Sequence, residues 1–119
     1  MNTVLAFLND LSANNHREWF ESNRVRYEQS RNEVLQLTDR LIEEIRGFDP
    51  TIPPLNGKEC LFRIYRDVRF SPNKAPYKTY FGSYMAVGGR KSVRAGYYLH
   101  IDPTGSFMGG GIYMPESPV

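Results

Sequence analysis

Cysteine and histidine are scarce in this sequence, with one cysteine and two histidines among 119 residues. The single cysteine, Cys60, allows no internal disulfide, and His16 and His100 stand too far apart to form a metal-ligand motif. These absences exclude a disulfide scaffold and a zinc site. We therefore predict a protein of a reducing compartment without a bound metal or cofactor, in which Cys60 is a small core residue.

Long apolar runs are also missing. The longest are a few residues, far below the roughly twenty that cross a bilayer. Residues 1–10 lack the basic region and the cleavage site of a secretory signal. The sequence therefore predicts a cytoplasmic protein with no membrane partner.

Positive charge is concentrated in one part of the chain. Residues 1–60 carry seven basic and ten acidic side chains, residues 61–100 carry eight and one, and residues 101–119 carry two acids. The net charges of −3, +7 and −2 give the overall charge of +2. An excess of this size attracts anions, although a basic run is as often a solvated surface as a binding site.

Residues 1–48 have the spacing of amphipathic helices. We expect a first helix capped by Thr3, and a short second helix opened by a capping box of Asn15 and Glu18. A longer helix is expected from about Arg24 to Phe48. Its buried stripe is predicted to contain Tyr27, Val34, Leu37, Leu41, Ile45 and Phe48.

Residues 49–60 contain three prolines and one glycine, which predicts an ordered, irregular connector. Neither flank is long enough to build its own core, so we expect one domain, residues 1–119. With 40% hydrophobic and 24% charged residues, the composition is that of a globular protein.

From residue 61 the apolar period falls to two, which is typical of strands. Four strands are expected, over residues 61–70, 80–87, 96–101 and 107–113. The apolar face of the first strand would hold Phe62, Ile64, Val68 and Phe70. The predicted fold is α+β, with the N-terminal helices packed on one face of an antiparallel meander of about four strands, residues 61–114.

Residues of the opposite parity form a second, polar face in this arrangement. That face would gather Arg63, Tyr65, Asp67, Arg69, Tyr80, Tyr84, Tyr98 and His100. Because arginine binds carboxylate and phosphate through two parallel hydrogen bonds, the face is a candidate binding surface. The alternative is that helices or a partner chain cover it and its hydroxyls satisfy buried groups.

Asp67 is the one acid within the arginine cluster. Its pKa is expected to be depressed by Arg66 and Arg69, which suits a group that orients an arginine better than a general base. Arg66 falls on the apolar parity, so we expect it at a bulge or buried against an acid, with Asp49 and Glu59 as candidates.

Lysines and a histidine complete the set of candidate polar groups. Lys74 and Lys78, with Tyr77 between them, either reach an anion that the arginines also contact or are solvated. His100 is the candidate proton shuttle, and beside arginines it would stay neutral at pH 7, although a lone strand histidine is more often structural.

The pattern Arg63-x-x-Arg66-Asp67-x-Arg69-Phe70, followed by Asn73, Lys74 and Tyr77, resembles the signature of the bacterial family called domain of unknown function 2461. The segments FLxxLxxNNxREWF, DPxIPP, AGYYLHI and GGGIYMPES are also similar to that family. The resemblance covers almost the whole chain, and it implies motif membership without a role for any residue. It further implies that the chain is the N-terminal part of a longer protein, so that a C-terminal region or a second copy would cover the sheet.

Three functions fit these observations. In the first, Arg63, Arg66, Arg69, Lys74 and Lys78, aided by Tyr65 and Tyr77, bind a phosphate or carboxylate, either as a binding domain or as part of an enzyme that acts on a small anionic metabolite. In the second, the basic, tyrosine-rich face binds nucleic acid or a protein. In the third, the arginines and Asp67 are a purely structural lock.

Overall fold

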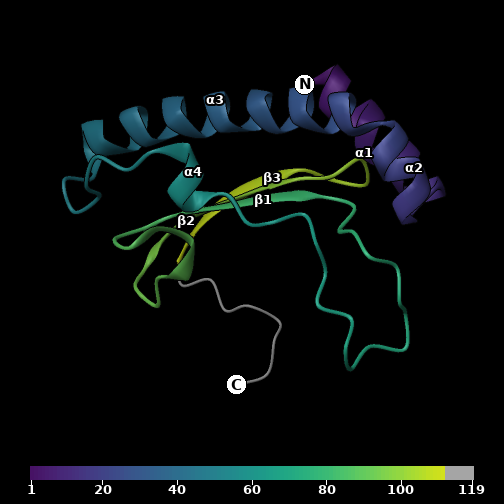
Figure 1. The fold of residues 1–119 in the computed structure, drawn as a ribbon. Coiled ribbons are helices and arrows are strands. Elements are labelled where there is room, and N and C mark those ends of the chain that lie inside the picture. Colours follow the sequence, from purple (N-terminus) through teal and green to yellow (C-terminus); the bar gives the residue numbers. More distant parts are fainter. Residues whose placement is uncertain (112–119) are drawn as a thin grey trace.

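The computed structural model describes residues 1–111, in which helices are followed by an antiparallel sheet (Figure 1). The helices are α1 (Asn2–Ala13), α2 (Arg17–Ser22), α3 (Arg24–Phe48) and α4 (Gly57–Cys60). The strands are β1 (Phe81–Met85), β2 (Gly96–Ile101) and β3 (Phe107–Gly111), in the order β1-β2-β3, with the 3₁₀ turn η1 (Gly89–Lys91) between the first two. The predicted α+β class is confirmed, with three strands in the described residues instead of about four.

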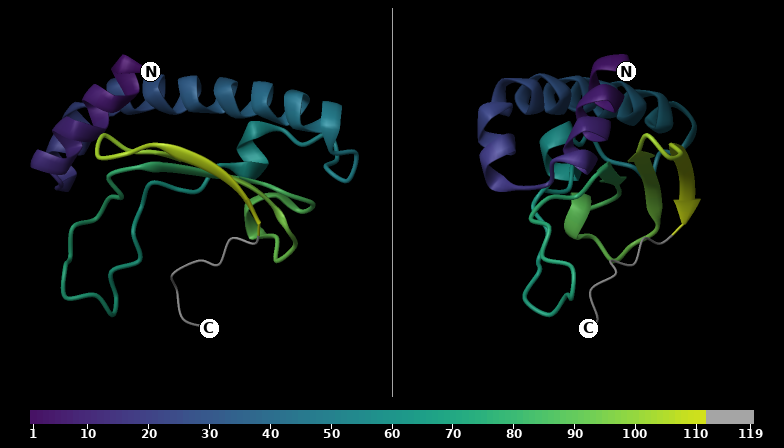
Figure 2. Two further views of the ribbon diagram at one scale, coloured as in Figure 1. Left: turned by 180° about the vertical axis from the view of Figure 1, so that it is seen from behind. Right: turned by 90° about the vertical axis from the view of Figure 1, so that its right-hand side faces the viewer.

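The helices lie on one side of the sheet. Helix α3 runs along the face of the sheet, and α1 and α2 lie near its N-terminal end (Figure 1). The turned views show the chain between α4 and β1 extending away from the helices (Figure 2). The core between helices and sheet buries apolar side chains from both layers, each of which stabilises the fold by about 1.5–3 kcal/mol. They include Phe7, Leu11, Phe20, Val34, Ile42, Ile45, Phe81, Met85, Leu99 and Ile101.

The buried face of α3 differs from the predicted stripe. Phe48 is 68% exposed and instead meets the ring of Tyr97 edge-on. The buried residues are Ser30, Val34, Leu35, Thr38, Ile42 and Ile45. The prediction was wrong for Phe48 and omitted Leu35 and Ile42, whereas Val34 and Ile45 are buried as predicted and Tyr27, Leu37 and Leu41 are partly buried against the core on this face. Two small polar residues belong to it, and the hydroxyl of Thr38 lies 3.3 Å from that of Ser83 on β1.

Both predicted helix caps at the N-terminal end are wrong. Met1 is the cap residue of α1, so Thr3 lies within the helix. Helix α2 is capped by His16, whose Nδ1 accepts the Trp19 N–H at 3.3 Å. Asn15 lies one residue earlier, and its amide is used in a contact with Tyr77 instead.

The connector after α3 ends in a helix that was not predicted. Asn56 and Glu59 form a capping box around α4, in which each side chain accepts the main-chain N–H of the other residue. The N–H of Gly57 donates to the Asp39 carboxylate at 2.6 Å, which ties α4 to α3. A Cβ at Gly57 would lie 2.9 Å from the carbonyl oxygen of Leu35, so glycine allows this close packing.

Residues 61–70 do not form the expected strand. With the rest of residues 1–111 the segment forms two isolated bridges, Leu61 to Ser83 and Tyr65 to Tyr77. The second bridge sits in a short ladder in which the Arg66 N–H donates to the carbonyl of Pro76. Pairing stops there because Pro76 has no N–H that could donate to the carbonyl of Arg66 and complete the pair. Phe70, placed on the apolar face by its parity, is 92% exposed.

The remaining strands follow the predicted positions closely. Strand β1 is shorter than residues 80–87, β2 agrees with residues 96–101, and β3 begins as predicted, whereas residues 112 and 113 lie outside the described residues. Tyr84 was expected on the polar face but is 1% exposed, and its hydroxyl donates to the carbonyls of Arg94 and Gly111. Tyr84 is therefore a structural residue of the sheet.

Candidate anion-binding site

The loop of residues 66–76 closes on itself through Arg66. The guanidinium donates from Nη1 to the carbonyls of Ala75 at 2.8 Å and Asn73 at 3.2 Å, and from Nη2 to the hydroxyl of Ser71 at 3.3 Å. The expected acid partner, Asp49 or Glu59, is therefore wrong. Carbonyls of a tight loop point inward and accept several donors, so they satisfy a half-buried guanidinium without a second charge.

Asp67 and Arg69 form a pair within the same loop. Arg69 donates from Nε and Nη2 to the two Asp67 carboxylate oxygens, at 3.0 and 2.7 Å. These bonds, joined by one from the Arg69 N–H, lower the pKa of Asp67 to about 2. The depressed pKa expected for Asp67 is confirmed, with Arg69 as its cause, and this exposed carboxylate is ionised at neutral pH.

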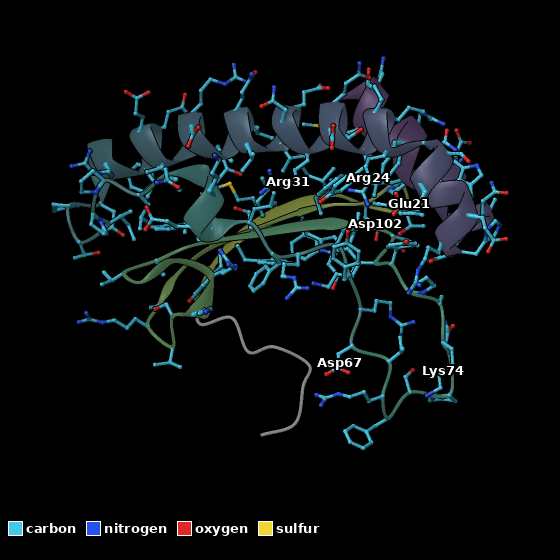
Figure 3. All side chains as sticks on the ribbon, viewed as in Figure 1. Glu21, Arg24, Arg31, Asp67, Lys74 and Asp102 are labelled. Atoms are coloured by element: carbon cyan, nitrogen blue, oxygen red, sulfur yellow. The ribbon has the colours of Figure 1, made fainter. Side chains whose placement is uncertain are left out.

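The two other polar motif residues of the loop are also used locally. Lys74 donates from Nζ to the carbonyl of Val68 at 2.6 Å, and Asn73 accepts the Ala75 N–H at 3.0 Å. Figure 3 shows Asp67 and Lys74 on this loop, away from the helices. The hydrogen bonds of the motif residues from Arg66 to Lys74 are thus made within the loop and fix its shape.

Tyr77 lies at the base of the loop and is buried. Its ring stacks on that of Phe20, with centroids 4.1 Å apart. The Asn15 amide donates to the Tyr77 carbonyl at 2.8 Å and accepts its N–H at 3.1 Å. Tyr77 therefore anchors the loop to the helices.

Arg63, Tyr65 and Lys78 lie together where the loop meets the sheet. The Arg63 guanidinium is 5.7 Å from the centre of the Tyr65 ring. Lys78 donates from Nζ to the Arg63 carbonyl at 2.6 Å, and the same ammonium lies 5.7 Å from the centre of the Phe62 ring. These side chains line an opening in the surface.

Two adjoining cavities, of about 290 and 220 Å³, form this opening. They share Phe62, Arg63, Tyr65 and Arg90. We call the combined cavity the basic groove. Its lining also includes Tyr27, Arg31, Lys58, Leu61, Ile64, Arg66, Asp67 and Lys78.

Three of the groove's basic residues were missed by the sequence interpretation. Arg31 comes from α3 (Figure 3), Lys58 from α4 and Arg90 from η1, so no local pattern unites them. The sequence held one signal, the Gly88-Gly89 pair before Arg90. Gly89 has φ +71, and a Cβ there would lie 2.4 Å from the carbonyl oxygen of Glu59. Glycine thus brings η1 against α4, where Arg90 donates to the Lys58 carbonyl at 2.9 Å.

Positive charge in the groove is poorly balanced. Six basic side chains and one acid line it, and that acid, Asp67, already pairs with Arg69. Within residues 1–111, the side chains of Arg31, Lys58 and Arg63 form no hydrogen bond or ion pair. Burial, together with the nearby Arg63, lowers the pKa of Lys78. The groove is therefore a site of positive potential.

A second polar cluster lies on the face of the sheet that is turned away from the helices. The ring of His100 stacks between Tyr80 and Phe107, at centroid distances of 4.6 and 4.9 Å. Its Nδ1 is 2.9 Å from the Tyr98 hydroxyl, and its Nε2 is 3.3 Å from the Asp102 carboxylate. The expectation of His100 beside arginines is wrong, because the loop carries the arginines away from β2.

Asp102 is held in its charged form within this cluster. Burial alone would raise the pKa of Asp102, but hydrogen bonds from Thr104 and the contact with His100 outweigh it and lower that pKa. The ionised carboxylate thus orients the imidazole, so that Tyr98 faces its other nitrogen. Of the predicted polar face, the structure brings together Tyr80, Tyr98 and His100, and separates them from the arginines of the loop.

Among residues 1–111, no three His, Cys, Asp or Glu side chains gather closely enough to hold a metal ion. No helix in this part of the chain is both long enough and apolar enough to cross a membrane.

These observations define a small α+β domain with a basic groove between its helices, the base of a self-closed loop and η1. The chain belongs to the family described as Conserved hypothetical protein (DUF2461), whose model matches residues 3–119. The resemblance of the segment from Arg63 to Tyr77 is thereby confirmed. Searches of curated proteins and of solved structures found no match.

Proposed function

We propose that this domain binds a small anion, a phosphate or carboxylate group, in the basic groove. The observation that carries the proposal is the set of groove cations without acidic partners in residues 1–111, above all Arg63. Arg63 is exposed and lines the cavity without an ion pair, so a bound anion would give it charge-assisted hydrogen bonds that the described part of the protein does not supply.

The proposal assigns different roles to the two halves of the motif. Arg63 and Lys78 bind the anion together with Arg90, since all three line the larger cavity. Arg66 and the pair of Asp67 and Arg69 hold the loop that carries these residues, as their hydrogen bonds support. One part of the motif then binds the anion, and the other part holds the loop in its conformation.

The proposal is tested by titrating the protein with inorganic phosphate and with citrate while recording amide NMR spectra. Shifts should concentrate at Arg63, Lys78 and Arg90. The Arg63→Gln variant should bind about tenfold more weakly, which corresponds to ~1.4 kcal/mol and to the loss of one hydrogen bond between charged groups.

Arg40→Gln is the matched control, because Arg40 is an exposed arginine of α3 that does not line the groove. It should bind both anions as the wild type does. The proposal would be overturned by the absence of shifts at millimolar anion, or by an equal loss of affinity in the two variants.

A nucleic-acid interface is the second candidate, and a different observation favours it. Phe70 is 92% exposed at the loop, and the Arg69 guanidinium lies 5.6 Å from the centre of its ring. An exposed aromatic ring beside a guanidinium is a stacking platform for a single-stranded base. Binding of a labelled oligonucleotide that weakens steeply with salt and is lost in Phe70→Ala would support this function. No anisotropy change at low salt would exclude it.

A further inference from the structure

Lys78 and Lys74 make the same main-chain contact in different surroundings. Each donates from Nζ to a carbonyl oxygen at 2.6 Å, Lys78 to Arg63 and Lys74 to Val68. Lys74 is exposed on the loop, whereas Lys78 is half-buried, covers the ring of Phe62 and lines the basic groove. One lysine of the pair is therefore placed within a concave site.

The surroundings of Lys78 make its ammonium less stable than that of a lysine in water. Burial penalises the ammonium, Arg63 repels it, and both lower the pKa of Lys78. The other charged groups of the same cavity are Arg66, Arg90 and Asp67, and the carboxylate among them is held by Arg69. A lysine that is desolvated beside another cation is the arrangement in which an amine becomes nucleophilic near neutral pH.

We propose that Lys78 forms a Schiff base with an oxo acid whose carboxylate binds in the basic groove. The inference rests on the proposed anion site and adds a reaction to it. Arg63 and Arg90 bind the carboxylate, and the carbonyl group next to it meets Nζ of Lys78. The hydrogen bond from Nζ to the Arg63 carbonyl holds the nitrogen in place and leaves its lone pair for the attack.

The step balances without a further reactant. The Nζ lone pair attacks the carbonyl carbon, and a proton passes from nitrogen to the former carbonyl oxygen, which gives a carbinolamine. That oxygen then leaves as water with the second amine proton, and a carbon–nitrogen double bond remains. The imine withdraws electrons from the neighbouring carbon atoms, which is the purpose of covalent catalysis by lysine.

The probes follow from this chemistry. Pyruvate and glyoxylate each carry a carboxylate next to a carbonyl group, and sodium borohydride reduces their imines to stable secondary amines. The full chain is incubated with each probe at neutral pH and reduced, and the modified lysine is identified by peptide mass spectrometry. We expect at least about tenfold more adduct at Lys78 than at Lys74, because the bound carboxylate holds the carbonyl beside one amine only.

Two variants and one competitor make the result decisive. Lys78→Arg keeps the charge and should lose the adduct, Lys74→Arg should retain it, and circular dichroism checks that both variants are folded. Inorganic phosphate should reduce the adduct because it occupies the carboxylate position. Adducts spread evenly over the lysines, or none at all, would overturn the inference.

Different results would overturn the Schiff base at Lys78 and the anion site in the basic groove. Phosphate shifts in the groove without an adduct at Lys78 would overturn the Schiff base and leave the anion site standing. An adduct at Lys78 that saturating phosphate does not reduce would overturn the anion site and leave a reactive amine.

Discussion

The side-chain amide of Asn15 makes two hydrogen bonds with the main chain of Tyr77, donating to its carbonyl at 2.8 Å and accepting its N–H at 3.1 Å. The two residues are 62 positions apart in the sequence. The contact joins the turn between α1 and α2 to the base of the loop, where Lys78 follows directly. The position of the groove lysine therefore depends on the N-terminal helices.

Replacing Asn15 with alanine should loosen the base of the loop. Both hydrogen bonds are lost and two partly buried main-chain groups are left unpaired, so we expect a loss of about 1–3 kcal/mol in the free energy of unfolding. Urea denaturation measures it. Asn14→Ala is the control, because within residues 1–111 the Asn14 side chain donates to the carbonyl of Asp10 in the adjoining helix α1 and to no other group. A loss as large in this variant would contradict the role of Asn15.

Arg66 should matter more for stability than the neighbouring Arg69. Arg66→Met leaves the carbonyls of Asn73 and Ala75 without their donor, and we expect a loss of about 1–2 kcal/mol, measured by urea denaturation. Arg69→Met removes an exposed pair with Asp67 and should leave the unfolding midpoint almost unchanged. Equal effects of the two substitutions would contradict the division of the motif.

The helices could be predicted because their evidence is local. The apolar spacing of Val4, Phe7 and Leu11 gives α1, and the boundaries of α3 agree with the prediction. The caps could not be predicted, because Asn15 suits a capping position and a contact with a distant main chain equally well. Only the tertiary structure decides between these two uses of an amide.

The strand predicted for residues 61–70 is a case in which local evidence was misleading. Ile64 and Phe70 have the same parity, yet Ile64 is 2% exposed and Phe70 is 92% exposed. An alternating pattern predicts which residues share a face only while a neighbouring strand continues to pair. Pairing ends at Pro76, so the alternation of apolar and polar residues beyond Arg66 no longer corresponds to two faces of a sheet.

The candidate site could be predicted only in part for a related reason. Arg63 and Lys78 belong to the basic segment and were found from it, whereas Arg31 and Lys58 come from helices in which basic and acidic residues are equal in number. They reach the groove because α3 and α4 pack beside Phe62. Packing between distant elements leaves no pattern in a single sequence.

Asp67 should titrate with a pKa of about 2, below its ordinary value, because Arg69 donates to both carboxylate oxygens. Since the folded pKa lies below the unfolded one of about 3.9, the pair stabilises the fold above the unfolded pKa, by the small amount that an exposed ion pair contributes. That stabilisation is lost as pH falls through the folded pKa. Carbon NMR of the carboxyl group measures the titration. Arg69→Gln should return the pKa toward its ordinary value, and an unchanged pKa in this variant would show that Arg69 is not the cause.

Gly82 leaves the space in which the Tyr98 hydroxyl reaches His100. A Cβ at Gly82 would lie 2.9 Å from that hydroxyl and 3.5 Å from the ring of Phe62, so Gly82→Ala must displace Tyr98. We expect the hydrogen bond to His100 Nδ1 to break, together with a loss of about 1–3 kcal/mol in stability from overpacking.

The imidazole ¹⁵N shifts of His100 report this change, since Nδ1 would lose its partner while Nε2 keeps Asp102. Gly109→Ala is the matched control. Gly109 lies opposite Tyr98 on β3, and a Cβ there meets no described atom within 4 Å. If the His100 shifts were the same in Gly82→Ala and in the wild type, Tyr98 would have room to move aside while keeping its bond, and the glycine would not be required for the contact.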